Sequence, residues 1–148
     1  PSIDKAYKFL RAALFRRIER YYQSTEVGLL LKRCENLHEF LESIRTASCM
    51  EAEMRQRLCR EVVQLSRGMR PKIVVNKVTN AYEAKIASNI LAKYARHLLY
   101  MEPEHLGHLF FDKCVGEAVN SGIPFVVGKP RQKISGCIVD MANRLGYF

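Results

Sequence analysis

The chain has 148 residues, of which 48% are hydrophobic and 26% are charged. This length and balance are typical of one globular domain and exclude an intrinsically disordered chain. There are 24 lysine and arginine residues against 15 acidic ones, which gives a net charge of +9. The charge is spread along the chain, so it indicates either a solvated basic surface or attraction to phosphates, anionic lipid or an acidic partner.

The cysteine pattern points to a reducing compartment. Because the five cysteines are odd in number and form no C-x-x-C pair, we expect free thiols in a cytosolic protein rather than disulfides or a zinc site. They are Cys34, Cys49, Cys59, Cys114 and Cys137. No apolar run approaches the roughly 18 residues of a membrane span. The sequence opens at Pro1 without an initiator methionine, and we expect it to be an excised part of a larger protein.

The first 70 residues are predicted to be helical, with no strand. Ser2 is the expected N-cap of a first amphipathic helix, in which apolar side chains recur every three or four residues as far as Tyr21. A second helical stretch is predicted over about residues 26–45. Within it, Asn36 and Glu39 resemble a capping box that would restart the helix.

A third helix has the clearest predicted ends. Ser48 and Glu51 form an S-x-x-E capping box before it, and Gly68 followed by Pro71 ends it. Its apolar stripe consists of Met50, Met54, Leu58, Val62 and Leu65.

After Pro71 the pattern changes to alternating strands and helices. The predicted order is a strand at 73–75, a helix at 81–99, a strand at 106–111, a short helix at 115–120, a third strand or edge segment at 124–127 and a final helix at 132–145. The two long helices carry apolar stripes, which are Tyr82, Ile86, Ile90, Tyr94 and Leu98 in the first and Ile134, Cys137, Ile138, Met141 and Leu145 in the second. This order predicts an α/β fold with a parallel sheet and crossover helices.

Two local patterns resemble chemical sites and are rejected. The segment from Gly122 to Lys129 is one residue too long for a phosphate loop, and Pro130 replaces the hydroxyl residue that binds magnesium. His105 and His108 are spaced like metal ligands on a helix, but residues three apart on a strand point to opposite faces. We therefore favour a structural role for both histidines.

Asn76 is the most informative polar residue. It follows the apolar run 73–75, at the carboxyl end of a predicted buried strand, where ligands bind in open α/β sheets. Its carboxamide can donate and accept together, which suits the edge of an adenine ring. An equally good interpretation is that Asn76 caps the helix that follows.

Three segments, taken in order, resemble the second half of MinD/ParA-type P-loop ATPases, closest to the MinD-like branch that includes the FlhG-like flagellar-placement ATPases, and the final helix also fits. Residues 1–7 resemble the end of the family's Pro-Glu-Pro-Thr-Ser-Ile-x-Asp-Ala-Tyr segment. Residues 73–78 resemble its apolar strand ending in Asn-(Arg/Lys)-Val. Residues 106–130 resemble its Leu-Gly-x-(Ile/Leu)-Pro-x-Asp-x-x-Val signature and the prolines that follow it. Residues 141–145 fit its closing helix.

The resemblance covers about residues 1–13 and 71–146 and implies a partial parallel sheet of a P-loop NTPase, lacking the half that carries the phosphate loop. It implies that the parent protein binds ATP and Mg²⁺ and that this chain alone binds neither and has no catalytic residue. The adenine site it implies consists of Asn76, Lys77, Phe110, Phe111 and Asp112.

The resemblance also defines the expected organisation, a single α/β unit over residues 1–148 with a helical insertion at 14–70. We expect the insertion to be either a partner-binding or regulatory element, or a packing arm that covers the sheet. A helix within it carries Arg55, Arg57, Arg60 and Arg67.

The implied function is a C-terminal part of an ATP-binding protein that positions cell-division, flagellar or other surface machinery. We expect a cytoplasmic protein, open to peripheral contact with the inner membrane face, that self-associates through an exposed sheet edge and binds a protein partner through the insertion. The alternative is a non-enzymatic basic helical adaptor for a protein, anionic lipid or nucleic acid. Nucleic acid is the least favoured partner, because basic residues and aromatics cluster only weakly, at Arg16, Arg17, Arg20, Tyr21 and Tyr22.

Overall fold

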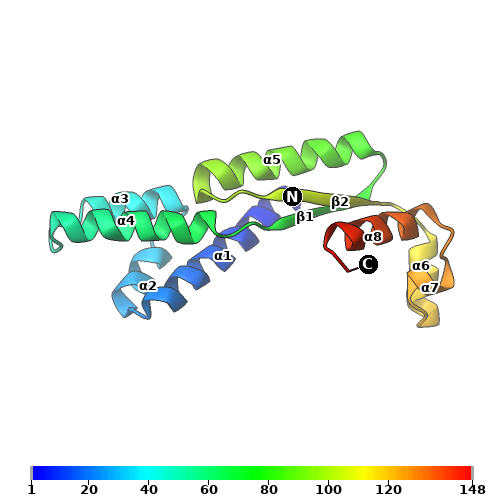
Figure 1. The fold of residues 1–148 in the computed structure, drawn as a ribbon, viewed down its shortest axis with the longest axis horizontal. Helices are drawn as coiled ribbons and strands as arrows, with labels where there is room; N and C mark the ends of the chain where they lie inside the picture. The colour runs from blue at the N-terminus through cyan, green and yellow to red at the C-terminus, as the bar shows by residue number, and fades with distance from the viewer. Residues whose placement is uncertain (1, 148) are drawn as a thin grey trace. The chain divides into compact units, whose positions relative to one another are not determined.

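The computed structural model describes residues 2–147 and has a mixed α/β, mostly helical fold (Figure 1). The elements are α1 (Ser2–Tyr22), α2 (Thr25–Lys32), α3 (Leu37–Arg45), α4 (Ala52–Arg67), β1 (Lys72–Val78), α5 (Ala81–Leu99), β2 (Glu104–Phe110), α6 (Cys114–Ser121), α7 (Phe125–Gly128) and α8 (Lys133–Arg144). The chain divides into a helical unit, residues 1–71 with 90–103, and a sheet unit, residues 72–89 with 104–148. Helix α5 contributes its first half to the sheet unit and its second half to the helical unit.

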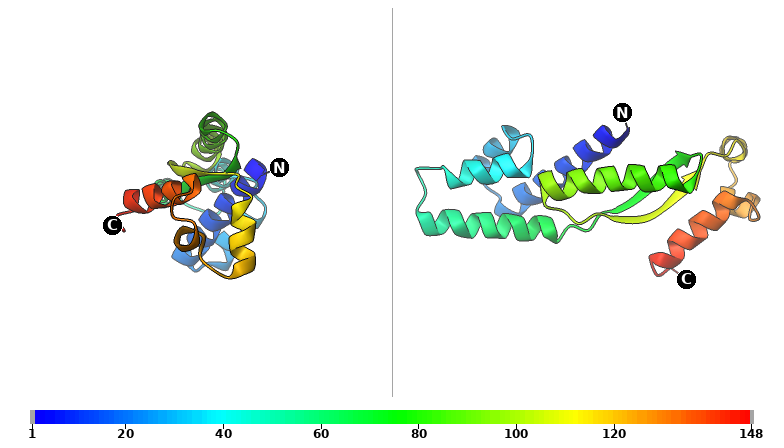
Figure 2. Two further views of the ribbon diagram at one scale, coloured as in Figure 1. Left: turned by 90° about the vertical axis from the view of Figure 1, so that its right-hand side faces the viewer. Right: turned by 90° about the horizontal axis from the view of Figure 1, so that it is seen from above.

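The helical unit has a continuous apolar core. Helix α1 extends over the predicted residues and buries the middle of its predicted stripe, Leu10, Leu14 and Ile18. Helices α3 and α4 lie side by side (Figures 1 and 2), and α1 contacts both α2 and α4. The other buried apolar residues of this unit are Leu31, Leu37, Phe40, Leu41, Ile44, Val62, Leu91, Ala92, Ala95, Leu99 and Met101.

The predicted helical stretch 26–45 is two helices, α2 and α3, and the predicted restart at Asn36 is confirmed. The Asn36 side chain accepts a hydrogen bond from the Glu39 backbone N–H at 3.0 Å. The Glu39 carboxylate in turn accepts from the Glu35 N–H at 2.7 Å. Both bonds satisfy backbone donors at the start of α3, which would otherwise lack partners.

The predicted capping box at Ser48 is wrong. Helix α4 starts at Ala52, and its N-cap Glu51 makes no side-chain capping bond. The guanidinium of Arg55 instead donates to the backbone carbonyls of Ala47 and Met50 and so shapes the turn before the helix. The predicted end at Gly68 is confirmed.

In the sheet unit, β1 and β2 pair in parallel, as the strand–helix–strand order predicts. Ile73 pairs with His105 and Val75 with His108, but the pairing has two irregularities. One extra residue lies in β2 between His105 and Gly107, and the other falls in β1 between Val75 and Val78. Arg144 of α8 donates to the carbonyl of Leu106 at the first irregularity, at 2.8 Å, and α8 packs against β2.

The apolar stripe predicted for α5 does not face the core. Tyr82 is 73% exposed and Tyr94 51%, and Ile86 and Ile90 are also exposed. The buried residues of α5 are instead mostly small: Ala84, Ser88, Leu91, Ala92, Ala95 and Leu99.

The third predicted strand is also wrong, because residues 125–128 form the short helix α7. Gly128 N–H donates to the Pro124 carbonyl at 3.0 Å, and Lys129 N–H donates to the Phe125 carbonyl at 2.8 Å. Within residues 2–147 the sheet therefore has two strands. The final helix α8 is confirmed and buries Ile134, whereas Leu145, the last residue of its predicted stripe, is 45% exposed.

Candidate functional site

A hollow of about 460 Å³ opens at the carboxyl ends of β1 and β2, and we call it the base hollow. All five residues that the sequence analysis selected line it: Asn76, Lys77, Phe110, Phe111 and Asp112. Parallel pairing brings residues 76–77 at the end of β1 close to residues 110–112 at the end of β2, because parallel strands end at the same edge of a sheet. The rest of the wall comes from Leu109, the start of α6, Phe125 and the first turns of α8.

Asn76 and Lys77 occupy the irregularity in β1. Lys77 has φ = 59°, in the left-handed region that non-glycine residues seldom adopt. The Asn76 side-chain oxygen accepts a hydrogen bond from the Lys77 backbone N–H at 2.8 Å. Within residues 2–147, the Asn76 side-chain amide donates to no partner. The Asn76 NH2 group is therefore a hydrogen-bond donor without a partner at the rim of the hollow. Bulges near binding sites often redirect a side chain in this way.

The helix-cap interpretation of Asn76 is wrong. Helix α5 is capped by Asn80, whose side-chain oxygen accepts from the Glu83 backbone N–H at 2.9 Å. The Glu83 carboxylate accepts from the backbone and the hydroxyl of Thr79, at 2.9 and 2.8 Å. These bonds leave no capping role for Asn76 at this helix.

Two phenylalanines give the base hollow an aromatic wall. The ammonium group of Lys133 lies 3.7 Å from the ring centroid of Phe110, and the His108 ring meets Phe110 edge to face at 4.9 Å. These contacts hold the Phe110 ring in place. Phe111 is 61% exposed, and its backbone N–H donates to the Val78 carbonyl at 3.0 Å.

Asp112 shapes the turn that leads into α6. Its carboxylate accepts a hydrogen bond from the Cys114 backbone N–H at 2.8 Å. A side-chain hydrogen bond to the same carboxylate, together with its charge, raises the pKa of the Cys114 thiol. Cys114 therefore stays protonated at neutral pH, where a thiol is a poor nucleophile.

Three lysines, Lys77, Lys113 and Lys133, lie in or beside the base hollow, against one carboxylate there, Asp112. The hollow therefore offers apolar and aromatic surface to a flat ring and positive charge to an anionic group attached to it. The sequence analysis missed Lys133, because it belongs to a helix that only the tertiary fold brings to Phe110.

His105 and His108 point the same way, contrary to the expectation from strand alternation. Their rings are stacked, with centroids 6.2 Å apart and planes 21° apart. The extra residue in β2 between them offsets the alternation. Burial, the His108 ring and the Arg144 guanidinium lower the pKa of His105, so its neutral form is favoured.

Comparison of this chain with protein-family models, with curated proteins and with solved structures found no match. Among the described residues, no helix is both long and apolar enough to cross a membrane.

Proposed function

We propose that this chain is part of a MinD/ParA-like ATP-binding protein and that the base hollow holds one side of the adenine ring. In this proposal the parent protein uses ATP to position cell-division, flagellar or other surface machinery. The chain supplies a wall of the base site and takes no part in the chemistry.

One observation carries the proposal. The carboxamide of Asn76, whose NH2 group donates to no partner within residues 2–147, and the aromatic ring of Phe110 line one hollow where two parallel strands end. A carboxamide pairs with the donor and acceptor edge of a purine, and an aromatic ring stacks on its face. Lys77 and Lys113 add positive charge that favours a ligand with phosphates.

The residues present do not fit a magnesium site. Mg²⁺ prefers several oxygen ligands in octahedral geometry. Within residues 2–147 no group of three or more His, Cys, Asp or Glu side chains gathers to hold a metal, and the Asp112 carboxylate already accepts the Cys114 N–H. The proposal therefore assigns Mg²⁺ and most phosphate contacts to other parts of the parent protein.

The test is an NMR titration of the isotope-labelled chain with ATP and, separately, with tripolyphosphate, which carries the charge without the base. We expect ATP to shift the Asn76 side-chain amide and the backbone signals of residues 110–112. Because the phosphate half of the site is assigned to other parts of the parent protein, we expect no stable complex with this chain alone, only transient association with a dissociation constant of about 1 mM, or about −4 kcal/mol.

Tripolyphosphate should leave the Asn76 side-chain amide signal unchanged, although its charge can shift backbone signals beside Lys77 and Lys113. Asn76→Ala should remove the base-dependent shifts while the remaining spectrum keeps its dispersion. Identical shifts from ATP and tripolyphosphate would mean that the hollow binds charge alone, and the adenine proposal would then be abandoned.

A second candidate, the non-enzymatic basic adaptor, is favoured by a different observation. Three arginines, Arg45, Arg55 and Arg60, surround one hollow in the α3–α4 hairpin, within the segment 14–70 that the resemblance leaves unmatched. The two functions are compatible, since the base hollow belongs to the sheet unit and the arginines to the helical unit.

A further inference from the structure

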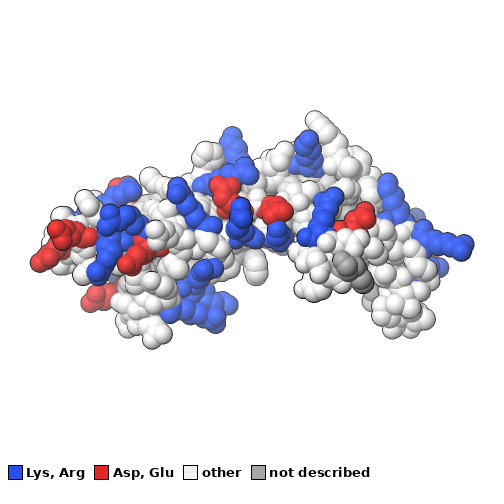
Figure 3. Space-filling model, viewed as in Figure 1, with Lys and Arg blue, Asp and Glu red and all other residues white. Residues whose placement is uncertain are grey.

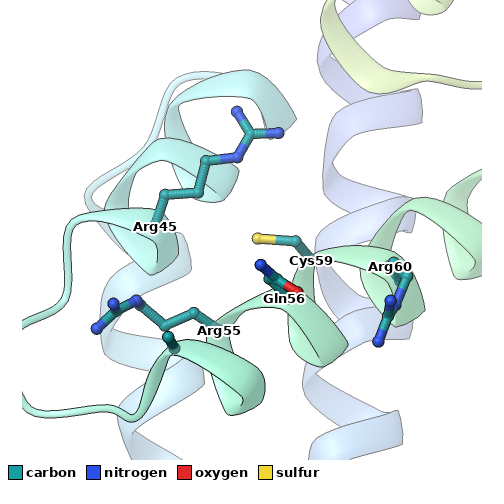
Figure 4. Close-up of a pocket in the computed structure, with 6 residues that line it drawn as sticks. Arg45, Arg55, Gln56, Cys59 and Arg60 are labelled. Carbon is teal, nitrogen blue, oxygen red and sulfur yellow. The ribbon is translucent and has the colours of Figure 1, made fainter.

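The α3–α4 hairpin carries a hollow of about 490 Å³ that base binding does not use, and we call it the arginine hollow. Arg45 comes from the last turn of α3, and the other lining residues come from the part of α4 between Ala52 and Arg60. Those other residues are Ala52, Arg55, Gln56, Cys59 and Arg60. In Figure 4, Cys59 and Gln56 lie among the three arginine side chains.

The three arginines differ in how much of their hydrogen-bonding capacity is already used. Arg55 is half-buried and donates to the carbonyls of the preceding turn, so its role is structural. Arg45 pairs with Glu42 on its own helix, and both side chains are about half exposed. Arg60 is exposed and makes no hydrogen bond or ion pair with any residue of the described part of the chain. Its permanently charged guanidinium group therefore has all its N–H donors available for a partner.

The charge around the arginine hollow identifies the class of partner. No carboxylate lines it, but the adjoining hollow of about 430 Å³ shares Gln56 and Arg60 and includes Glu51 and Glu53. Basic and acidic side chains alternate at this end of the face shown in Figure 3. A membrane or a nucleic-acid backbone presents a continuous negative surface, which these glutamates would repel. A polypeptide can place an acidic residue in one hollow and a neutral or basic residue in the next.

We propose that the arginine hollow binds an acidic segment of a protein partner. A carboxylate of that segment pairs with Arg60, whose planar guanidinium group matches its two oxygens. Gln56, between the two hollows, can donate to and accept from the partner's backbone. This proposal is independent of nucleotide binding.

The probe is a short fluorescein-labelled peptide of alternating Glu and Gly residues, with a Gln–Gly peptide as the neutral comparison. Fluorescence anisotropy with the full chain at physiological salt should show binding of the acidic peptide only. Arg60→Glu should weaken binding by about tenfold or more, the effect of losing one good charge pair. Arg67→Glu, the same charge change on α4 away from the hollow, should weaken it by less than about twofold.

A second readout follows Cys59, which is half-buried in the hollow. Peptide binding should slow alkylation of Cys59, measured by mass spectrometry, and leave Cys137 in the sheet unit unchanged. Arg60→Gln, which removes the charge without reversing it, should also weaken peptide binding, and it serves as the test if Arg60→Glu disturbs folding. The circular dichroism spectrum of Arg60→Gln should match that of the unmodified chain.

Three results would overturn the proposal. The first is equal weakening by Arg60→Glu and Arg67→Glu, which would mean diffuse attraction. The second is absence of acidic-peptide binding. The third is Arg60-dependent binding to phosphatidylserine-containing vesicles without binding to the peptide, which would identify a lipid surface instead.

Discussion

At the scale of single residues, Gly107 shows how closely β2 and α8 approach. A Cβ atom at Gly107 would lie 2.5 Å from the Cγ and 2.8 Å from the Sδ of Met141. Both distances are shorter than side-chain contacts normally allow. An alanine at this position would force the Met141 side chain to move, so the contact with α8 favours glycine here.

We therefore predict that Gly107→Ala lowers the free energy of unfolding by about 1–3 kcal/mol, as overpacking of a tight interior does. Chemical denaturation followed by circular dichroism measures the change. In a Met141→Ala background the same substitution should cost markedly less, because the opposing atoms are gone. An equal cost in both backgrounds would contradict this explanation.

The histidine pair shows a limit of residue-level reasoning. Strand alternation predicts opposite faces for His105 and His108, but one extra residue between them aligns their rings. A bulge depends on how the partner strand pairs, and nothing at these two positions in the sequence indicates it. The same holds for Lys77. Its backbone adopts a left-handed φ, but the sequence has no glycine at this position to indicate it.

At the scale of elements, the start of α5 is held by a reciprocal cap between Thr79–Asn80 and Glu83. Hydrogen bonds from the backbone and the hydroxyl of Thr79 lower the pKa of the Glu83 carboxyl below its ordinary value of 4.5. Its charged form is thus favoured by folding. The stabilisation is fully present above pH 4.5 and is lost as the pH falls through the lower pKa of the folded state.

Accordingly, we predict that the chain is more stable than Glu83→Gln at neutral pH and that this difference disappears in acid. Thermal melts at a series of pH values measure the difference. In a Thr79→Ala background the difference should be smaller at neutral pH, because one of the two donors is missing. A difference that does not change with pH would mean that the charge of Glu83 does not matter to the cap.

The elements also show which sequence signals were sufficient. The cap at Asn36, the end of α4 at Gly68 and the start of α8 agree with prediction, because each depends on neighbours a few residues away. The cap at Ser48 was wrong because the Arg55 guanidinium bonds the turn instead. Residues 124–127 are predicted as a third strand or edge segment, but no strand pairs with them, and helical hydrogen bonds satisfy the backbone.

At the scale of the whole molecule, the sheet has unusually few strands for a parallel sheet. Within residues 2–147 it has two strands, so each strand has an edge without a neighbouring strand. Parallel sheets are normally larger and covered on both faces. Val74 of β1 is exposed, as are the apolar side chains of α5 noted above.

Because unpaired strand edges and exposed apolar side chains favour association, we predict that the isolated chain forms dimers or larger oligomers. Light scattering over a range of concentrations should show a mass that rises with concentration. Val74→Lys, which places a charge on β1, should shift the equilibrium towards monomer. A monomer at every accessible concentration would contradict the prediction.

The sequence by itself determined most of the longer helices, the two principal strands and their order. These depend on local periodicity and caps. The end of a parallel strand singled out Asn76, whereas the set of five residues at the base hollow came from the family resemblance. Only the tertiary structure decided which face of α5 is buried, where the strands bulge, that Lys133 reaches Phe110, and that Arg45 and Arg60 line one hollow. Those features depend on contacts between residues far apart in the chain. The free energies of such contacts cannot be predicted from a local sequence pattern.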